Sequence, residues 1–301
     1  MSRNPSRRTT PPPSLLEAVA SAGAAYTGEA TPAGERAVDA ATSGLRGGGF
    51  RLTITVTPQQ AIFGPLPQGS QRVEGDTALP PGRRSPPDGP RFPPDDVREL
   101  PYWDTAQSPG PHPVLVVASD PPLVRRLSGP ADDLPAVVAR VRGWVEADAG
   151  KHPGKLLGEL STPGNHPAAY LAAFELLQRS APDIVALVEA FLDLPDRPGA
   201  ATRAVLGRVY QATGRLPETA RSTLGARLAA VLPREHDPAA LLGYLTWFDA
   251  YAGSLDGPTK AAVAREAERI AGMHLTGPDA TAWRSRLDQQ LASLRAKLGT
   301  P

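Results

Sequence analysis

The sequence predicts a mainly α-helical protein. A small α/β region with a few strands and a long proline-rich loop is followed by a C-terminal array of antiparallel helix pairs. The main evidence is a series of prolines spaced 15 to 21 residues apart in the C-terminal half, each opening a stretch with helical spacing of apolar residues. Proline is tolerated in the first turn of a helix, because its missing N–H would have no partner there. The series comprises Pro167, Pro182, Pro198, Pro217, Pro238, Pro258 and Pro278.

The N-terminal region begins with a polar, proline-bearing tail over residues 1–13, which we expect to be disordered. An alanine-rich segment from Ser14 to about Ser43 is predicted to be helical. Ser14 and Glu17 have the spacing of a capping box, which marks a helix start. Thr31-Pro32 is expected to divide this helix into two pieces.

Two segments have the patterns of β-strands. Residues 50–57 alternate apolar and polar side chains, which predicts a strand with one buried face. The short apolar run 61–63 is a candidate partner strand in a hairpin. The continuous β-branched run at 114–118 predicts a strand buried on both faces.

The segment 64–113 is predicted to be a flexible loop. It holds 13 of the 35 prolines and few large apolar residues. Such a segment buries too little surface to offset its ordering entropy. Tyr102 and Trp103 are its exceptions, and either pack on the protein or contact a partner.

From residue 131 onward every segment is predicted to be helical, so we divide the chain into an α/β region, 14–130, and a helical array, 131–301. A first helix is expected from about Asp132 to Ala147, and a shorter one over 151–160. The first helix has an apolar stripe of Val137, Val138, Val141, Trp144 and Val145. Each later helix carries apolar residues at i, i+3, i+4 and i+7, so each buries one face. The predicted N-terminal caps are Asn165, Ser180, Asp237, Asp256 and Thr276.

The repeating unit has a length similar to that of known helical repeats. Two consecutive helices occupy roughly 35–40 residues, which resembles the helical hairpins of HEAT-like or tetratricopeptide-like arrays. The signature residues of tetratricopeptide repeats are not present in register. An irregular bundle remains an alternative to a regular array.

Composition argues against several function classes. The chain has no cysteine, which excludes disulfides, thiolate nucleophiles and cysteine-based metal sites. Its 32 basic and 31 acidic residues nearly cancel, so no overall field favours nucleic acid or a membrane surface. No pair of histidines has metal-ligand spacing, and no nucleophile or phosphate-loop motif occurs. We therefore expect no metal, no cofactor and no catalytic residue.

We expect a cytoplasmic protein. No apolar run approaches the length of about 18 residues that spans a membrane. Arg7-Arg8 ahead of an apolar stretch leaves twin-arginine export as an alternative, although Pro11, Pro12 and Pro13 interrupt that pattern.

These observations favour a non-enzymatic scaffold or adaptor that binds another protein, since stacked helices offer extended surfaces. The candidate partner contacts are Tyr102, Trp103, Arg203 and Arg227.

Two alternatives stay open. One is an enzyme of unrecognised class, with Asp120, Arg125, Arg126 and His152 at the junction of the N-terminal region and the array. The other is nucleic-acid binding through the arginine-bearing helices, although acidic residues balance those arginines.

Overall fold

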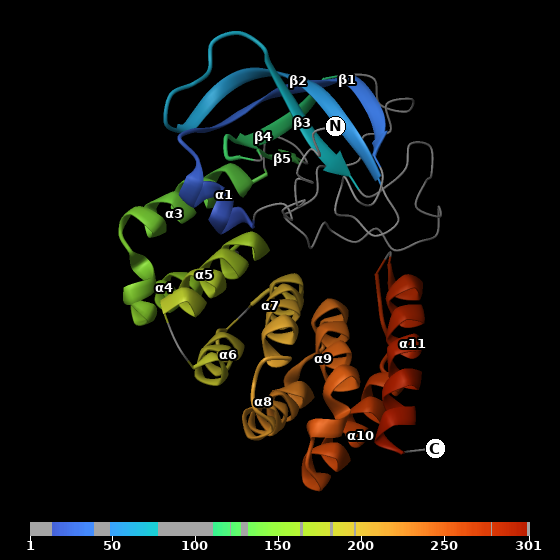
Figure 1. Cartoon of the computed structure of the whole chain (residues 1–301). Coiled ribbons are helices and arrows are strands. Elements are labelled where there is room, and N and C mark those ends of the chain that lie inside the picture. The colour runs from blue at the N-terminus through green and yellow to red at the C-terminus, as the bar shows by residue number, and fades with distance from the viewer. Residues whose placement is uncertain are drawn as a thin grey trace, which may run out of the picture. The chain divides into compact units, whose positions relative to one another are not determined.

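The computed structural model describes residues 14–38, 49–77, 111–120, 122–127, 132–162, 165–180, 183–195, 197–277 and 279–299. They form two compact units, the sheet unit (described residues from 14 to 147) and the helical unit (described residues from 148 to 299) (Figure 1). The protein is mainly helical with a small antiparallel sheet, as predicted. The helix expected from Asp132, which we had placed with the array, belongs to the sheet unit.

Within the described residues, the sheet has five antiparallel strands in the order β3-β2-β1-β4-β5. The strand predicted over 50–57 is confirmed as part of β2, and the one predicted over 114–118 is confirmed as β4. β4 pairs on both sides and is buried from Val114 to Val117, which agrees with its continuous β-branched run. The strands are β1 (Ala25–Val38), β2 (Gly49–Phe63), β3 (Gln71–Thr77), β4 (His112–Val117) and β5 (Leu123–Arg126).

The helix predicted from Ser14 to Ser43 is wrong over residues 22–38. Helix α1 spans Leu15–Ser21, and its capping box of Ser14 and Glu17 is present as expected. After a three-residue connection, Ala25–Val38 forms β1, which pairs with β2 on one side and β4 on the other. Two ladders of backbone hydrogen bonds therefore outweigh the weak helical preference of the alanines. Residues 39–48 lie outside the described part of the chain.

Two further expectations about this sheet are wrong. Residues 61–63 continue β2 and do not return as its partner. The return strand is β3, which lies within the segment 64–113 expected to be a loop. Residues 64–70 precede β3 without forming a helix or strand, and residues 78–110 lie outside the described part of the chain.

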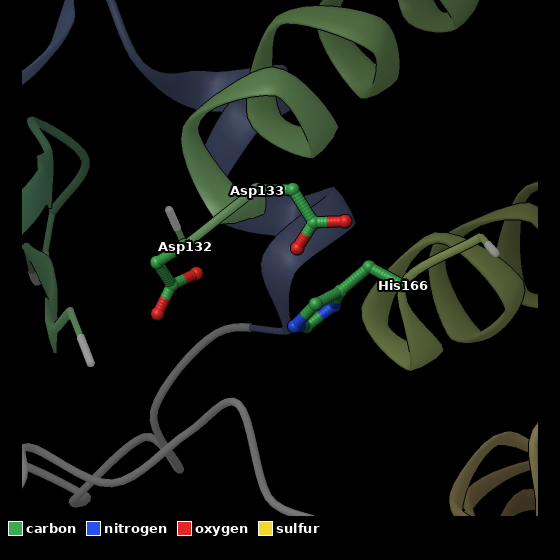
Figure 2. Close-up of side chains that lie close together, drawn as sticks. All are labelled: Asp132, Asp133 and His166. Carbon is green, nitrogen blue, oxygen red and sulfur yellow. The ribbon is translucent and has the colours of Figure 1, made fainter. Parts of the chain in front are cut away.

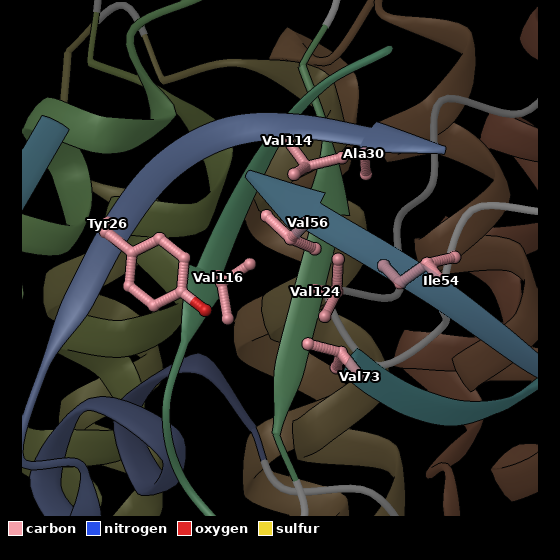
Figure 3. Close-up of a cluster of buried hydrophobic side chains, with 8 residues drawn as sticks. All are labelled: Tyr26, Ala30, Ile54, Val56, Val73, Val114, Val116 and Val124. Carbon is pink, nitrogen blue, oxygen red and sulfur yellow. The ribbon is translucent and has the colours of Figure 1, made fainter. Parts of the chain in front are cut away.

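One face of the sheet carries a shared apolar core (Figure 3). The register pairs Tyr26 with Val116 and Ile54 with Val73, so these side chains point to the same side. Thr27 and Glu29 alternate with the buried residues of β1 and lie toward the opposite, more exposed face. The core cluster consists of Tyr26, Ala30, Ile54, Val56, Val73, Val114, Val116 and Val124.

Helix α3 (Leu134–Glu146) packs on α1, β1 and β2. Its predicted apolar stripe is buried at Val137, Val138, Val141 and Trp144. Arg142 donates hydrogen bonds to the carbonyl oxygens of Val19 and Ala22, at 3.2 and 3.3 Å, at the end of α1. Its guanidinium also lies 4.9 Å from the centre of the Phe63 ring. A positive charge near the C-terminus of a helix is favourable, which fits the position of Arg142 beside α1. Through these contacts Arg142, a residue of α3, connects that helix to α1 and β2.

The helical unit begins with a short 3₁₀ turn, η1 (Ala149–Lys151), and contains helices α4 to α11. Two more 3₁₀ turns, η2 (Leu232–Arg234) and η3 (Ala252–Ser254), extend α8 and α9. The helices are α4 (Pro153–Leu160), α5 (Pro167–Ser180), α6 (Ile184–Leu192), α7 (Gly199–Thr213), α8 (Glu218–Val231), α9 (Pro238–Tyr251), α10 (Gly257–Gly272) and α11 (Ala280–Leu298).

The prolines of the series lie at helix starts wherever the structure describes them. Pro167 and Pro238 are the first residues of α5 and α9. Pro198 and Pro217 are the N-caps of α7 and α8, and Pro258 is the second residue of α10. Pro182 and Pro278 lie outside the described residues. The prediction that prolines open these helices is confirmed for the described members of the series.

Two aspartates cap helices as predicted. Asp237 accepts hydrogen bonds from the N–H groups of Ala239 and Ala240 at the start of α9. Asp256 accepts one from Thr259 at the start of α10. Hydrogen bonding from the side chain and backbone of Thr259 lowers the pKa of Asp256 below its ordinary value of 3.8.

The caps predicted at Ser180 and Thr276 are wrong. Ser180 is the last residue of α5, and α6 is capped by Asp183, whose carboxylate accepts from two N–H groups of the first turn. Helix α11 begins later than expected, after Asp279. In both cases the aspartate, three residues after the hydroxyl, lies at the cap position itself.

The cap predicted at Asn165 is also wrong. Its amide donates to the carbonyl oxygens at the end of α4, including that of Leu160 at 3.2 Å. The start of α5 is satisfied by His166 instead, whose Nδ1 accepts from the N–H of Ala168 at 3.1 Å. Asn165 therefore caps the C-terminal end of α4, and His166 caps the N-terminal end of α5.

The helices of this unit pack on their second neighbours along the chain. Helix α7 contacts α5 and α9, and α9 also contacts α11 (Figure 1). Helix α8 contacts α6 and α10 in the same way. The helices thus form two rows, one with α5, α7, α9 and α11 and the other with α6, α8 and α10.

Candidate functional site

The predicted partner contacts have different environments. Tyr102 and Trp103 lie outside the described residues. Arg203 lies on α7 and is half-buried, and its backbone closely approaches Gly243 of α9. Arg227 lies on α8 with 62% of its side chain exposed, and it forms an ion pair with Glu189 of α6 at 2.5 Å. Arg227 therefore joins two helices of one row.

Several other arginines of the helical unit are engaged inside the fold. Arg208 of α7 forms an ion pair with Glu175 of α5, and both side chains are largely buried. Arg197 lies 3.4 Å from Glu235 and donates to the carbonyl oxygen of Leu192 at the end of α6. These bonds direct arginine side chains toward helix ends and acids within the unit.

The same use of arginine recurs farther along the chain. Arg269 of α10 donates to the carbonyl oxygens of Leu232 and Glu235, at 3.1 and 3.2 Å, beside η2. Arg284 of α11 donates to the carbonyl oxygens of Ile270 and Ala271, both at 3.2 Å, at the end of α10. Cations placed there satisfy the last carbonyls and complement the helix dipole. The bonds assign a structural role to these arginines.

An aromatic cluster extends from the core of the helical unit to its surface. The ring of Phe248 lies 5.5 Å from that of Trp247 in an edge-to-face arrangement. Trp247 lies 5.0 Å from Tyr251, and Tyr251 lies 5.6 Å from Tyr210, measured between ring centres. We call these four residues the aromatic cluster. Its members come from α9, except for Tyr210, which comes from α7.

Tyr210 is the exposed end of this cluster. Among the described residues, Tyr210 and Leu66 are the large apolar side chains that stand exposed, at 41% and 39%. The backbone carbonyl of Tyr210 accepts a hydrogen bond from the hydroxyl of Tyr251 at 2.7 Å. Burial raises the pKa of Tyr251 further above its ordinary value of 10.0, at which the hydroxyl is already protonated and able to donate at neutral pH. The arrangement holds Tyr210 firmly while leaving its ring open to solvent.

Tyr210 was not among the residues selected from sequence. The helical spacing of the sequence does contain a signal that groups Tyr210 with a predicted contact. The positions i, i+4 and i+7 on one face of α7 are occupied by Arg203, Gly207 and Tyr210. Periodicity alone does not separate an exposed face from a buried one when glycine and tyrosine lie on it. The predicted contact Arg203 and the unpredicted Tyr210 thus belong to the same face.

The residues proposed for an enzyme site are distributed over the two units. Arg125 is buried in β5 at 6% exposure, whereas its neighbour Arg126 is exposed. Asp120 is exposed in the turn between β4 and β5. His152 is exposed at the start of α4 in the helical unit. Within the sheet unit, Arg125 and Arg126 alternate along one strand and point to opposite faces of the sheet.

Figure 2 shows three further side chains with metal-binding chemistry, Asp132, Asp133 and His166. The two aspartates precede α3 in the sheet unit, and Asp132 accepts a hydrogen bond from the N–H of Leu134 at 3.0 Å. His166 belongs to the helical unit, where it caps α5. Because the three residues belong to different units and two have capping roles, we assign no metal centre to them.

Among the described residues, no helix combines the length and the apolar character needed to cross a membrane. Comparison with known proteins found no matching family, no matching curated protein and no matching solved structure.

Proposed function

We propose that the chain is a non-enzymatic scaffold or adaptor that binds another protein through the α7–α9 face of its helical unit. We call this surface the Tyr210 face, defined by Arg203, Gly207 and Tyr210 of α7 with Tyr251 of α9. The proposal rests on one observation above the others, which is the exposed Tyr210 ring supported by the aromatic cluster. We keep the cytoplasm as the expected location.

The packing of the helices supports the proposal. Contacts between second neighbours are typical of arrays of antiparallel helix pairs, so we propose a HEAT-like or tetratricopeptide-like arrangement for the helical unit. Such arrays expose one row of helices along an extended surface. Helices α7 and α9 are adjacent members of one row, which gives the Tyr210 face neighbours on both sides.

The chemistry of the Tyr210 face also supports protein binding. Tyrosine and arginine are enriched among the residues that dominate binding energy at interfaces. A tyrosine that is already fixed by neighbours loses little side-chain entropy on binding. Tyr210 meets this condition through its ring contact with Tyr251 and the hydrogen bond to its carbonyl.

Nucleic-acid binding is a weaker proposal than protein binding, because several arginines of the helical unit already form ion pairs or hydrogen bonds within the fold. Arg208 and Arg227 are paired with acids, and Arg269 and Arg284 bond to backbone carbonyls. Nucleic-acid binding depends on basic side chains that are available to phosphates. No observation on the described residues favours an enzyme of a particular class.

The test is affinity capture of partners from the native host with the full chain and three variants. Tyr210→Ala removes the exposed ring, and Arg203→Glu reverses a charge on the same face of α7. Leu66→Ala is the matched control, because Leu66 has almost the same exposure but lies in the sheet unit. We expect the wild type and Leu66→Ala to recover the same protein, and the other two variants to lose it.

Binding measurements with the purified partner then give the change in affinity caused by each substitution. A residue at the centre of an interface contributes about 2 kcal/mol or more, so Tyr210→Ala should weaken binding roughly 30-fold. Circular dichroism must show that each variant retains the helical content of the wild type. The proposal is refuted if the wild type recovers no stable protein partner, or if a folded Tyr210→Ala variant binds that partner as tightly as Leu66→Ala does.

A further inference from the structure

No further inference is drawn: the strongest candidate outside the Tyr210 face, the acidic pair Asp132 and Asp133 at the N-terminus of α3, carries none because no second observation within its own unit points to a ligand.

Discussion

The contact between Thr213 of α7 and Trp247 of α9 gives a sharp test of how the two helices are joined. Both side chains are buried, at 0% and 1% exposure. The Thr213 hydroxyl donates to the carbonyl oxygen of Val209 at 2.6 Å and accepts from the indole N–H of Trp247 at 3.1 Å. Thr213→Val keeps the shape of the side chain but removes the acceptor, so it leaves the indole N–H buried without its partner.

The expected cost follows from that orphaned donor. A buried polar group that loses its partner costs about 1–3 kcal/mol, against little for an exposed hydroxyl. Thr246→Val on α9 is the control, because its hydroxyl bonds the carbonyl of Leu242 in the same way but is exposed. Both variants replace threonine by valine and lose one hydrogen bond from the hydroxyl to the carbonyl four residues earlier, so they share these two changes. Thr213→Val should therefore be the less stable variant by about 1–3 kcal/mol.

The assay is urea and thermal unfolding of the full chain, monitored by circular dichroism at a wavelength that reports helix content. For a unit of this size the melting temperature should fall by roughly 2–4 °C per kcal/mol. Trp247→Phe completes a double-mutant cycle. This substitution should lower the free energy of unfolding less in the Thr213→Val background than in the wild type, because in that background it removes an indole N–H that is already unpaired. Equal stability of Thr213→Val and Thr246→Val, or equal costs of Trp247→Phe in both backgrounds, would refute the reasoning.

Three further predictions concern helix starts and close packing. Ser14→Ala removes a capping box and should lower the free energy of unfolding of the sheet unit by about 1 kcal/mol, while Ser21→Ala at the exposed end of α1 should change urea unfolding little. The lowered pKa of Asp256 means that its cap stabilises the fold above pH 3.8 and loses this effect as the pH falls through the folded-state pKa. Asp256→Asn should therefore flatten the acid limb of a stability-against-pH profile, and an unchanged acid limb would contradict this. A Cβ on Gly199 would lie 1.8 Å from the carboxylate that caps α9, so Gly199→Ala should destabilise by about 1 kcal/mol through loss of that cap. Gly207→Ala, in open space on α7, should instead stabilise by about 0.5–1 kcal/mol in the same unfolding assay, and the opposite order would contradict the packing.

Features that depend on nearby residues could be predicted from the sequence. Prolines at helix starts, the caps Asp237 and Asp256, and the stripe of α3 follow from local backbone chemistry and helical periodicity. The alternation at 50–57 likewise gave a correct strand. The cap predicted at Ser180 was three residues too early, because a serine hydroxyl fits a helix start as well as the carboxylate of Asp183, which caps α6.

The proposed Tyr210 face overlaps only in part with the partner contacts predicted from the sequence. Arg203 was among those predicted contacts and Tyr210 was not, because the exposure of a ring on α7 depends on how α5 and α9 cover that helix. The roles of Arg208 and Arg227 also depend on acids more than thirty residues away in the chain. Sequence spacing does not reveal such pairs.

The sequence by itself thus determined where most helices of the C-terminal half begin and which of their faces are buried, because caps, fixed proline geometry and apolar spacing act within a few residues. Only the tertiary structure decided that Ala25–Val38 is a strand and that the aromatic cluster reaches the surface at Tyr210. Both outcomes are set by partners distant in sequence, namely β2 and β4 for the strand and α9 for the tyrosine. Hydrogen-bond ladders and side-chain packing with such partners exceed the small intrinsic preferences that a local pattern records.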